Sequence, residues 1–262
     1  MADFIRYTIE DKVATLVIDH APVNAFNKQT MQELSDAVDA LVANPDVKAV
    51  VVTGAGQLAF VAGADIGEIG GYVKAQDMAS AQAFIALGQQ VFSKIEASNK
   101  PFIAAINGVC LGGGLELAMA CHLRICGDRV RLGQPEINLG IIPGWGGTQR
   151  LQRIVGAAKA AEMILTGDQI TAQQAMQLRL VNMVVPGGEV MRQAKGLAAK
   201  IANKSAVAVA AAMNAIRAGL DAELHLGLAA ELAQFGHVTA SADAIEGITA
   251  FLEKREAKFQ DK

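Results

Sequence analysis

The sequence lacks several features that would assign it at once to a class of protein. It has no basic run longer than two residues and a formal net charge of −3, whereas nucleic-acid binding needs a basic stripe that neutralises phosphates. Its longest uninterrupted apolar run, near residues 206–213, is too short to cross a bilayer. The first residues show neither a charged-then-apolar leader nor an Arg/Ser-rich transit pattern. We therefore expect a soluble, cytoplasmic protein that binds neither nucleic acid nor a membrane.

Cysteine and histidine are scarce. The three cysteines, Cys110, Cys121 and Cys126, are odd in number and lie in apolar or helical surroundings, which favours reduced thiols in the cytosol over a disulfide framework. The four histidines show no ligand spacing, and the cysteines have no accompanying ligands, so no metal site is predicted. A serine nucleophile is not expected either, because there is no G-x-S-x-G and the serines fall in helical or helix-cap contexts.

Apolar residues and glycine are abundant. Apolar residues make up 52% of the 262 residues and charged residues 19%, and there are 26 glycines against 6 prolines. This composition is typical of a globular protein, and the length favours one large domain or one domain with a smaller extension. So much glycine suits tight strand-to-helix turns, where the backbone approaches a neighbour or a ligand.

Hydrophobic patterning predicts alternating strands and helices up to about residue 190. Residues 4–10 and 12–19 alternate apolar with polar side chains and are predicted to form a hairpin across Asp11. Apolar residues recur at helical spacing over residues 28–42. The further elements predicted in order are a buried strand over 49–53, a helix over about 78–97, a buried strand over 101–106, a short helix to about 121, short strands over 123–126 and 130–132, helices over 146–155, 157–165 and 171–178, and a strand over 180–185.

The character of the sequence changes at Val190. Strand signals vanish there, and Ala-rich helices are predicted to the end of the chain, with a helix cap at Ser205. Residues 207–216 are apolar on nearly every face, which indicates a helix enclosed by other elements or by other subunits. The prediction is therefore an α/β core over residues 1–190 and a helical region over residues 191–262. No convincing fixed-period repeat is visible.

Two stretches follow predicted buried strands and open helices, Phe60–Glu68 and Gly108–Ala118. Small residues at such turns leave backbone N–H groups uncovered, and a helix N-terminus adds a partial positive charge. If two such N–H groups converge, they form an oxyanion hole. The alternatives are glycines needed only for packing, or a nucleotide-phosphate loop. Neither stretch matches G-x-G-x-x-G or G-x-x-x-x-G-K-[ST], which disfavours a nucleotide site.

Two carboxylates near these turns are candidate acid/base groups. Glu116 lies two residues after Gly114 in an otherwise apolar helix start, so it is either a surface residue that complements the helix dipole or a partly buried acid/base with a raised pKa. Glu136 lies in a tight loop over residues 133–140, where a surface carboxylate is the alternative. Beside an oxyanion hole, such a pair can activate a water and move a proton at the adjacent carbon. Trp145, the only tryptophan, is either an acyl-pocket wall or ordinary core.

A dense set of motifs carries a family resemblance. In chain order they are Ala62-Gly-Ala-Asp-Ile66, Ala105-Ile-Asn-Gly108, Leu111-Gly-Gly-Gly-Leu-Glu116, Gly133-Gln-Pro-Glu136, Ile142-Pro-Gly144, Gly146-Gly-Thr-Gln-Arg150, Leu165-Thr-Gly-Asp168, Leu180-Val181 and Ala250-Phe-Leu-Glu-Lys-Arg255. On these motifs the sequence resembles the crotonase (enoyl-CoA hydratase/isomerase) superfamily from about residue 5 to 258. The resemblance implies an α/β fold of the ClpP/crotonase type, a spiral of β-β-α turns. It also implies that the C-terminal helices build trimers, usually paired into hexamers.

The resemblance further implies where the substrate is held. By analogy with the family, the backbone N–H groups of Ala64 and Gly113 form the oxyanion hole for the thioester oxygen. Contacts to the acyl-CoA substrate are implied for Ala62, Ala64, Asp65, Ile66, Gly67 and Gly113. Many relatives carry a lysine where Gly67 stands, so a charge contact from that position is absent here. Coenzyme A is part of the substrate, and neither a separate cofactor nor a metal is implied.

The family hosts several reactions, so the fold alone does not give the activity. Glutamates at both positions resemble the hydratases, because enoyl-CoA isomerases typically lack the one that matches Glu116. The resemblance thus implies an enoyl-CoA hydratase of the short-chain type, a hydro-lyase of fatty acid β-oxidation that adds water reversibly to trans-2-enoyl-CoA and gives 3-hydroxyacyl-CoA. The alternatives are an enoyl-CoA delta isomerase or an acyl-CoA hydrolase on the same scaffold and, more remotely, a non-catalytic or RNA-binding member.

The implied mechanism assigns a role to each group. The oxyanion hole polarises the thioester carbonyl and makes C3 electrophilic. Glu116 then positions and deprotonates the water that attacks C3, and Glu136 supplies the proton to C2. The reverse dehydration uses the same groups.

Overall fold

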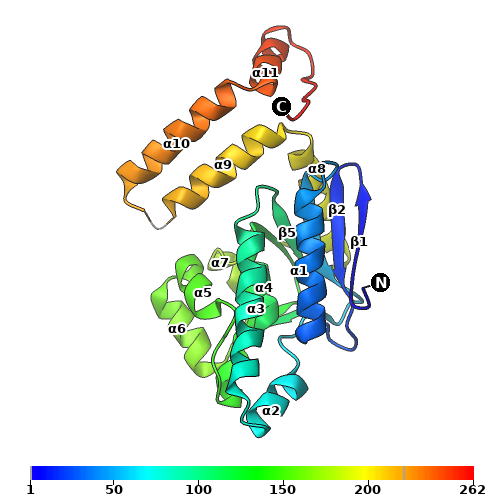
Figure 1. Cartoon of the computed structure of the whole chain (residues 1–262), viewed down its shortest axis with the longest axis vertical. Coiled ribbons are helices and arrows are strands. Elements are labelled where there is room, and N and C mark those ends of the chain that lie inside the picture. Colours follow the sequence, from blue (N-terminus) through cyan, green and yellow to red (C-terminus); the bar gives the residue numbers. More distant parts are fainter. Residues whose placement is uncertain (1, 221) are drawn as a thin grey trace.

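A computed structural model describes residues 2–220 and 222–262, in which strands and helices alternate before helices take over (Figure 1). The strands are β1 (Ile5–Glu10), β2 (Val13–Ile18), β3 (Ala49–Gly54), β4 (Ala59–Val61), β5 (Phe102–Ile106), β6 (Val109–Leu111), β7 (Leu123–Gly127), β8 (Arg131–Gly133), β9 (Gln169–Thr171) and β10 (Met183–Val185). The α-helices are α1 (Lys28–Ala43), α2 (Ile66–Lys74), α3 (Met78–Glu96), α4 (Gly113–Ala120), α5 (Gly147–Val155), α6 (Ala157–Thr166), α7 (Ala172–Gln177), α8 (Val190–Ala202), α9 (Ala206–Gly219), α10 (Leu224–Thr239) and α11 (Ala242–Leu252). Short 3₁₀ helices are η1 (Pro135–Leu139) and η2 (Gly187–Glu189).

The predicted elements are present in the predicted order. The hairpin across Asp11 is confirmed by the antiparallel pairing of β1 with β2. The cap at Ser205 is confirmed by the bond from Ala208 N to its hydroxyl. The strand predicted over residues 180–185 is shorter in the structure, because only its last three residues pair, with β7. Strands β4, β6 and β9 were not delimited from the sequence.

The strands form two sheets. The larger has the order β1-β2-β3-β5-β7-β10, and its neighbours are parallel except in the β1–β2 hairpin. The smaller has the order β4-β6-β8-β9, with β9 antiparallel to β8. Because β3, β5 and β7 are neighbours in one sheet and the strands that follow them are neighbours in the other, the chain winds as successive β-β-α turns. The predicted α/β spiral is confirmed. The turns differ in length, which explains why no fixed period is visible in the sequence.

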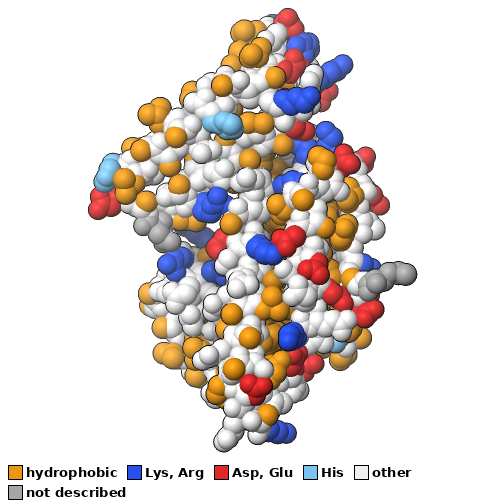
Figure 2. All heavy atoms as spheres, viewed as in Figure 1, with side chains coloured by type: hydrophobic (Ala, Val, Ile, Leu, Met, Phe, Trp, Pro, Cys, Tyr) orange, Lys and Arg blue, Asp and Glu red, His pale blue; other side chains and the backbone are white. Residues whose placement is uncertain are grey.

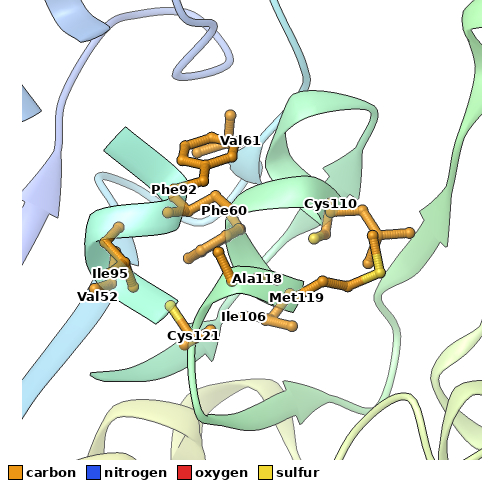
Figure 3. Packing of buried hydrophobic residues seen from close by; sticks show 14 of the residues in the cluster. Val52, Phe60, Val61, Phe92, Ile95, Ile106, Cys110, Ala118, Met119 and Cys121 are labelled. Carbon is orange, nitrogen blue, oxygen red and sulfur yellow. The ribbon is translucent and has the colours of Figure 1, made fainter. Parts of the chain in front are cut away.

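Strand β3 shows how the larger sheet is buried on both faces. All of its residues are buried, and alternate residues along a strand face opposite sides. Val50 and Val52 belong to the core shared with α1, α3, α4 and the smaller sheet, part of which Figure 3 shows. Ala49 and Val51 pack with helix α8 on the opposite face. A strand between two apolar layers therefore shows no apolar/polar alternation in its sequence.

Helix α8 lies after residue 190, where the strand signals end, yet it packs on the larger sheet through Ala194, Ala198 and Ala202. Helices α9 to α11 project from this α/β body (Figure 1). We call residues 206–252 the arm. Among the residues described in α9 only Ala211 is buried, and in α10 none is. The enclosure predicted for residues 207–216 is thus not provided by the chain itself.

The C-terminal tail returns from the arm to the body. The Lys48 ammonium, at the edge of β3, lies 2.7 Å from the Asp261 carboxylate and donates to Lys204 O. The same carboxylate accepts the backbone N–H of Ala206 at the start of α9. This ion pair therefore joins the end of the chain to the base of the arm. In the part of the chain that is described, no helix has the length and apolar character needed to cross a membrane.

Candidate active site

Two strand-to-helix turns of the smaller sheet lie side by side. Strands β4 and β6 are parallel neighbours, and each leads into a turn that opens a helix, α2 or α4. An ideal Cβ built on Gly63 would lie 3.9 Å from Gly113 N, so the two turns are in contact. As the first residue of α4, Gly113 has an N–H that its own helix cannot accept. The structure therefore brings together the turns of Ala64 and Gly113, the two residues to which the family resemblance assigns the oxyanion hole.

Glycine permits the close approach of α4 to the smaller sheet. An ideal Cβ on Gly114 would collide with Val61 O, a backbone atom that cannot move aside. Only glycine therefore allows the first turn of α4 to lie against β4. This contact fixes the depth at which Glu116, two residues further on, enters the core.

Glu116 is a buried carboxylate at the start of α4. It is 1% exposed, and its Oε1 accepts the backbone N–H groups of Trp145 at 2.8 Å and Gly147 at 2.6 Å. Burial raises its pKa to about 7; the nearby Glu136 carboxylate adds to the rise, while the two N–H groups and the Arg150 charge oppose it. Of the two alternatives left by the sequence, a solvated residue that complements the helix dipole is excluded.

Glu136 lies in η1, directly after strand β8. It is half-buried, and burial raises its pKa to about 7. An ideal Cβ on Gly112 would lie 2.8 Å from Glu136 Oε1, so this carboxylate borders the turn that opens α4. The structure thus places both predicted glutamates beside both predicted turns.

Gln134 is a polar residue of the site that sequence reasoning missed. Its side chain is fully buried. With the amide oriented so that its nitrogen faces Glu136, it donates to Oε1 at 3.0 Å and to Oε2 at 3.1 Å. The sequence offered one signal for this contact. Gln134 lies two residues before the candidate acid Glu136 in a tight loop, so its amide can reach that carboxylate. A buried amide needs a partner, and the nearest carboxylate supplies one.

A cavity of about 170 Å³ lies between the two turns and η1. Its lining consists of Ala62, Gly63, Ala64, Ile66, Ile69, Ile85, Gly112, Gly113, Glu116, Pro135, Glu136, Leu139, Ile141, Ile142, Gly144 and Trp145. Every predicted site residue except Asp65 and Gly67 belongs to this lining. The Asp65 carboxylate caps α2 instead, accepting the N–H groups of Gly67 and Glu68.

Trp145 is both core and cavity wall, so the two alternatives for it are not exclusive. It is 2% exposed, and its indole packs edge-on against three phenylalanine rings, Phe26, Phe84 and Phe92, at centroid distances of 5.9, 5.3 and 5.8 Å. Among the described residues its Nε1 finds no hydrogen-bond partner. An aromatic cage of this kind holds the ring in one orientation at the edge of the cavity.

The polar groups available for chemistry in the cavity are two carboxylates and backbone N–H groups. Within residues 2–220 and 222–262, no three His, Cys, Asp or Glu side chains are grouped so as to hold a metal ion. His122 is occupied structurally, since its Nδ1 accepts the Phe102 N–H, and burial lowers its pKa to about 4. With both glutamate pKa values near neutrality, the pair can hold one proton and one negative charge.

Comparisons with known proteins agree with this geometry. A family model described as enoyl-CoA hydratase/isomerase matches residues 8–262. A crotonyl-CoA hydratase from Syntrophomonas wolfei is 44% identical over 254 residues, which cover 97% of this chain and 96% of the relative. A short-chain-enoyl-CoA hydratase from Clostridium acetobutylicum is 42% identical over 94% of this chain and 93% of the relative. The solved structure of an enoyl-CoA hydratase from Bacillus anthracis superimposes with a TM-score of 0.94 at 35% identity, covering 99% and 100% of the two chains.

Proposed function

The chain belongs to the enoyl-CoA hydratase/isomerase family and is an enoyl-CoA hydratase, and we propose that Glu116 and Glu136 share the acid/base chemistry of its reaction. This hydro-lyase reaction adds water reversibly to a trans-2-enoyl-CoA and gives a 3-hydroxyacyl-CoA. The observation that carries the proposal is the placement of two carboxylates with raised pKa values on one cavity, beside two uncovered backbone turns.

The thioester oxygen is held by the backbone N–H groups of Ala64 and Gly113 in this proposal. Support comes from the contact between the two turns and from the position of Gly113 at a helix N-terminus, whose partial positive charge favours a developing oxyanion. Polarisation of the carbonyl draws electron density from C3 of the conjugated double bond and prepares it for attack.

Water addition then divides between the two glutamates. Both N–H donors to Glu116 use Oε1, so Oε2 is the oxygen assigned to the water. Glu116 takes a proton from that water as its oxygen bonds to C3, and Glu136 gives its proton to C2, so that one water is added across the double bond. Because both pKa values lie near 7, one carboxyl can be ionised and the other protonated at neutral pH.

The substrate's apolar parts fit the lining of the cavity. Ile66, Leu139 and Ile142 line it yet are more than half exposed, at 52, 56 and 66%. A bound thioester would cover these side chains at the cavity mouth. We assign Trp145, at the enclosed side, to the end of the acyl pocket. Coenzyme A, as part of the substrate, would run past residues 62–67, and the proposed reaction needs no separate cofactor.

We also propose that the enzyme assembles as a homo-trimer or a homo-hexamer through the arm. The arm exposes apolar residues on helices that the chain itself leaves uncovered, and faces of this kind mark protein interfaces. The three cysteines are free, buried thiols, which agrees with the reducing cytoplasm as the proposed compartment.

The decisive experiment follows crotonyl-CoA by two signals at once. A hydratase removes the absorbance of the conjugated thioester and releases no thiol. An acyl-CoA hydrolase releases free coenzyme A, which a thiol reagent detects, and an isomerase leaves crotonyl-CoA unchanged. Glu116→Gln, purified in parallel, controls for contaminating hydratase. If the wild-type protein leaves the absorbance intact, the proposed roles of the two glutamates fail.

A further inference from the structure

The orientation of Glu116 depends on a short backbone segment, Gly144–Gly147. Two of its N–H groups, from Trp145 and Gly147, bind the same carboxylate oxygen. A small rotation of this segment would redirect both donors and with them the carboxylate. The side chain that fixes this segment therefore influences the position of the catalytic oxygen.

Arg150 binds the same segment through a different backbone atom from those that bind Glu116. Its Nη1 donates to Trp145 O at 2.9 Å, whereas Trp145 N–H points to Glu116. The guanidinium is itself held by Glu96, the last residue of α3, which accepts from Nε at 3.2 Å and from Nη2 at 2.7 Å. The Arg150 side chain is 12% exposed, and it does not line the cavity. A planar guanidinium carries its donors on three nitrogens and so reaches Trp145 O and Glu96 at once, whereas an ammonium has all its donors on one nitrogen.

Gly146 provides the room for this arrangement. Its φ is +108°, a conformation that favours glycine, and an ideal Cβ there would collide with Arg150 Nη1. The guanidinium thus lies directly against the backbone between the two N–H donors. Arg150 N also donates to Gly146 O at 2.8 Å, so both the main chain and the side chain of Arg150 bind this segment.

We propose that Arg150, anchored by Glu96, is a positioning residue that fixes residues 145–147 so that both N–H groups bind Oε1 of Glu116 and Oε2 faces the water. The expected effect on catalysis rests on the proposed role of Glu116. The effect of Arg150 on the position of the Glu116 carboxylate is independent of that role. Since Arg150 does not line the cavity, we expect it to act on turnover rather than on substrate binding.

Arg150 also affects the protonation of Glu116. The charged groups that act on this carboxylate are Glu136 from η1, which raises its pKa, and Arg150 from α5, which lowers it together with the two N–H groups. Loss of Arg150 removes a positive charge and loosens both donors, and each change raises the pKa of Glu116. The low-pH limb of the hydration rate, where Glu116 becomes protonated, then moves to higher pH.

The test compares Arg150→Met, Arg150→Lys and Glu96→Gln. Lys94→Gln is the matched control, because Lys94 lies on the same helix and its ion pair with Asp39, at 2.6 Å, holds α1 rather than the loop. For Arg150→Met we expect kcat on crotonyl-CoA to fall about ten- to hundredfold, as small misplacements of catalytic groups do, with KM changed by less than about twofold. The kcat of Arg150→Lys should lie between those of Arg150→Met and the wild type. Glu96→Gln should lower kcat by less than Arg150→Met does, and Lys94→Gln should match the wild type.

A second readout needs no substrate. Trp145 is the only tryptophan and donates its backbone N–H to Glu116, so its fluorescence should change as that carboxyl titrates. The titration is assigned to Glu116 if it disappears in Glu116→Gln and persists in Glu136→Gln. We expect the midpoint to rise in Arg150→Met and not in Lys94→Gln. An unchanged midpoint, or a loss of kcat that Lys94→Gln shares, overturns the inference. If Arg150→Met does not fold, the same two measurements on Arg150→Lys and Glu96→Gln decide: kcat should fall and the fluorescence midpoint should rise, and an unchanged midpoint overturns the inference. If the wild type leaves crotonyl-CoA unchanged, the proposed function fails while the fluorescence midpoint still tests Arg150.

Discussion

The α/β body and the arm treat their large apolar side chains in opposite ways. The body buries Phe26, Phe60, Phe92 and Phe102 completely. The arm exposes most of its large apolar residues, and hydrophobic side chains, coloured orange, are visible along its helices in Figure 2. Those more than half exposed are Ile216, Leu220, Leu224, Leu226, Leu228, Leu232, Phe235, Ile245, Ile248, Phe251 and Leu252.

The contrast separates two tasks within one sequence. All residues of the chain that line the cavity fall between positions 62 and 145, inside the body. The arm has helical propensity and apolar surface but buries little of it within the chain, which is why we propose that a second copy covers it. Two hypotheses can therefore be tested: that the groups for the chemistry all come from the body, and that a second copy covers the arm.

The largest effect is expected from charge in the arm. Leu232→Asp combined with Phe235→Asp places two carboxylates on α10 at residues that are 73 and 68% exposed in the single chain. Burying them in an apolar interface would cost several kcal/mol. We expect light scattering to give a multiple of 27.3 kDa for the wild type and 27.3 kDa for the variant. Val73→Asp, an exposed apolar residue of helix α2 in the body, should keep the wild-type mass. A wild-type mass of one chain, or an unchanged mass in the variant, would refute the role of the arm.

The next largest effect tests the chemistry of the body. Glu116→Gln and Glu136→Gln should each lower kcat at least about a hundredfold, because each removes one of the two proton transfers. The amide oxygen that Glu116→Gln introduces can still accept from Trp145 and Gly147, so the loop should persist. Circular dichroism and thermal melting should show an intact fold, and light scattering should show the wild-type mass. Full activity in either variant refutes the role assigned to that glutamate.

Local sequence patterns were sufficient for much of the body. Helix α7 lies within the predicted range 171–178 and begins with a capping box formed by Thr171 and Gln174, and helix α1 covers the range predicted for it. An isolated carboxylate in an apolar helix start, after a glycine-rich turn, sufficed to nominate Glu116, whereas Ala64 and Gly113 were named through the family resemblance. Each of these signals lies within a few residues of chain, where sterics and capping chemistry decide the outcome.

The remaining features depend on distant contacts. Strands β4, β6 and β9 have three residues each, too few to show a period. The buried carboxylate of Glu116 is hydrogen-bonded by donors 29 and 31 residues away along the chain. The packing of α8 on the sheet was hidden because its alanines resemble those of the exposed arm helices. Only the tertiary arrangement distinguishes the alanine face of α8, which packs on a sheet, from the alanine-rich helix α9, which the chain leaves largely uncovered.

A third test measures how much the buried carboxylate of Glu116 lowers the free energy of unfolding of the body. Folding raises the pKa of Glu116 from 4.5 to about 7, so ionisation opposes folding. This penalty is absent below about pH 4.5, grows as the pH rises, and is complete above about pH 7. Glu116→Gln removes it and should stabilise the protein by on the order of 2–3 kcal/mol at about pH 8 and by far less at about pH 5.

The measurement is the thermal midpoint of wild type and Glu116→Gln at both pH values and one protein concentration, since assembly also affects the midpoint. Glu162→Gln, which removes an exposed carboxylate on α6, controls for the loss of a charge. A gain of equal size at both pH values would show that burial of the charge is not the cause. A loss at high pH would show that the ionised carboxylate stabilises the loop more than burial destabilises it.

The smallest expected effect asks whether the body alone limits the acyl chain. Trp145→Leu shortens the aromatic wall of the cavity while keeping it apolar, which should admit longer chains at a benefit of about 1 kcal/mol. We expect the ratio of kcat/KM for an eight-carbon over a four-carbon enoyl-CoA to rise about three- to tenfold. Phe102→Leu, a fully buried aromatic that does not line the cavity, should leave the ratio unchanged and so separates pocket size from general loosening. If Trp145→Leu still hydrates crotonyl-CoA but the ratio does not move, the acyl chain is limited elsewhere, and the arm of a neighbouring copy becomes the region to examine. The body would then supply the catalytic groups, but it would not determine the acyl chain length that the enzyme accepts. Substrate selection would depend on the arm of a neighbouring copy as well as on the cavity.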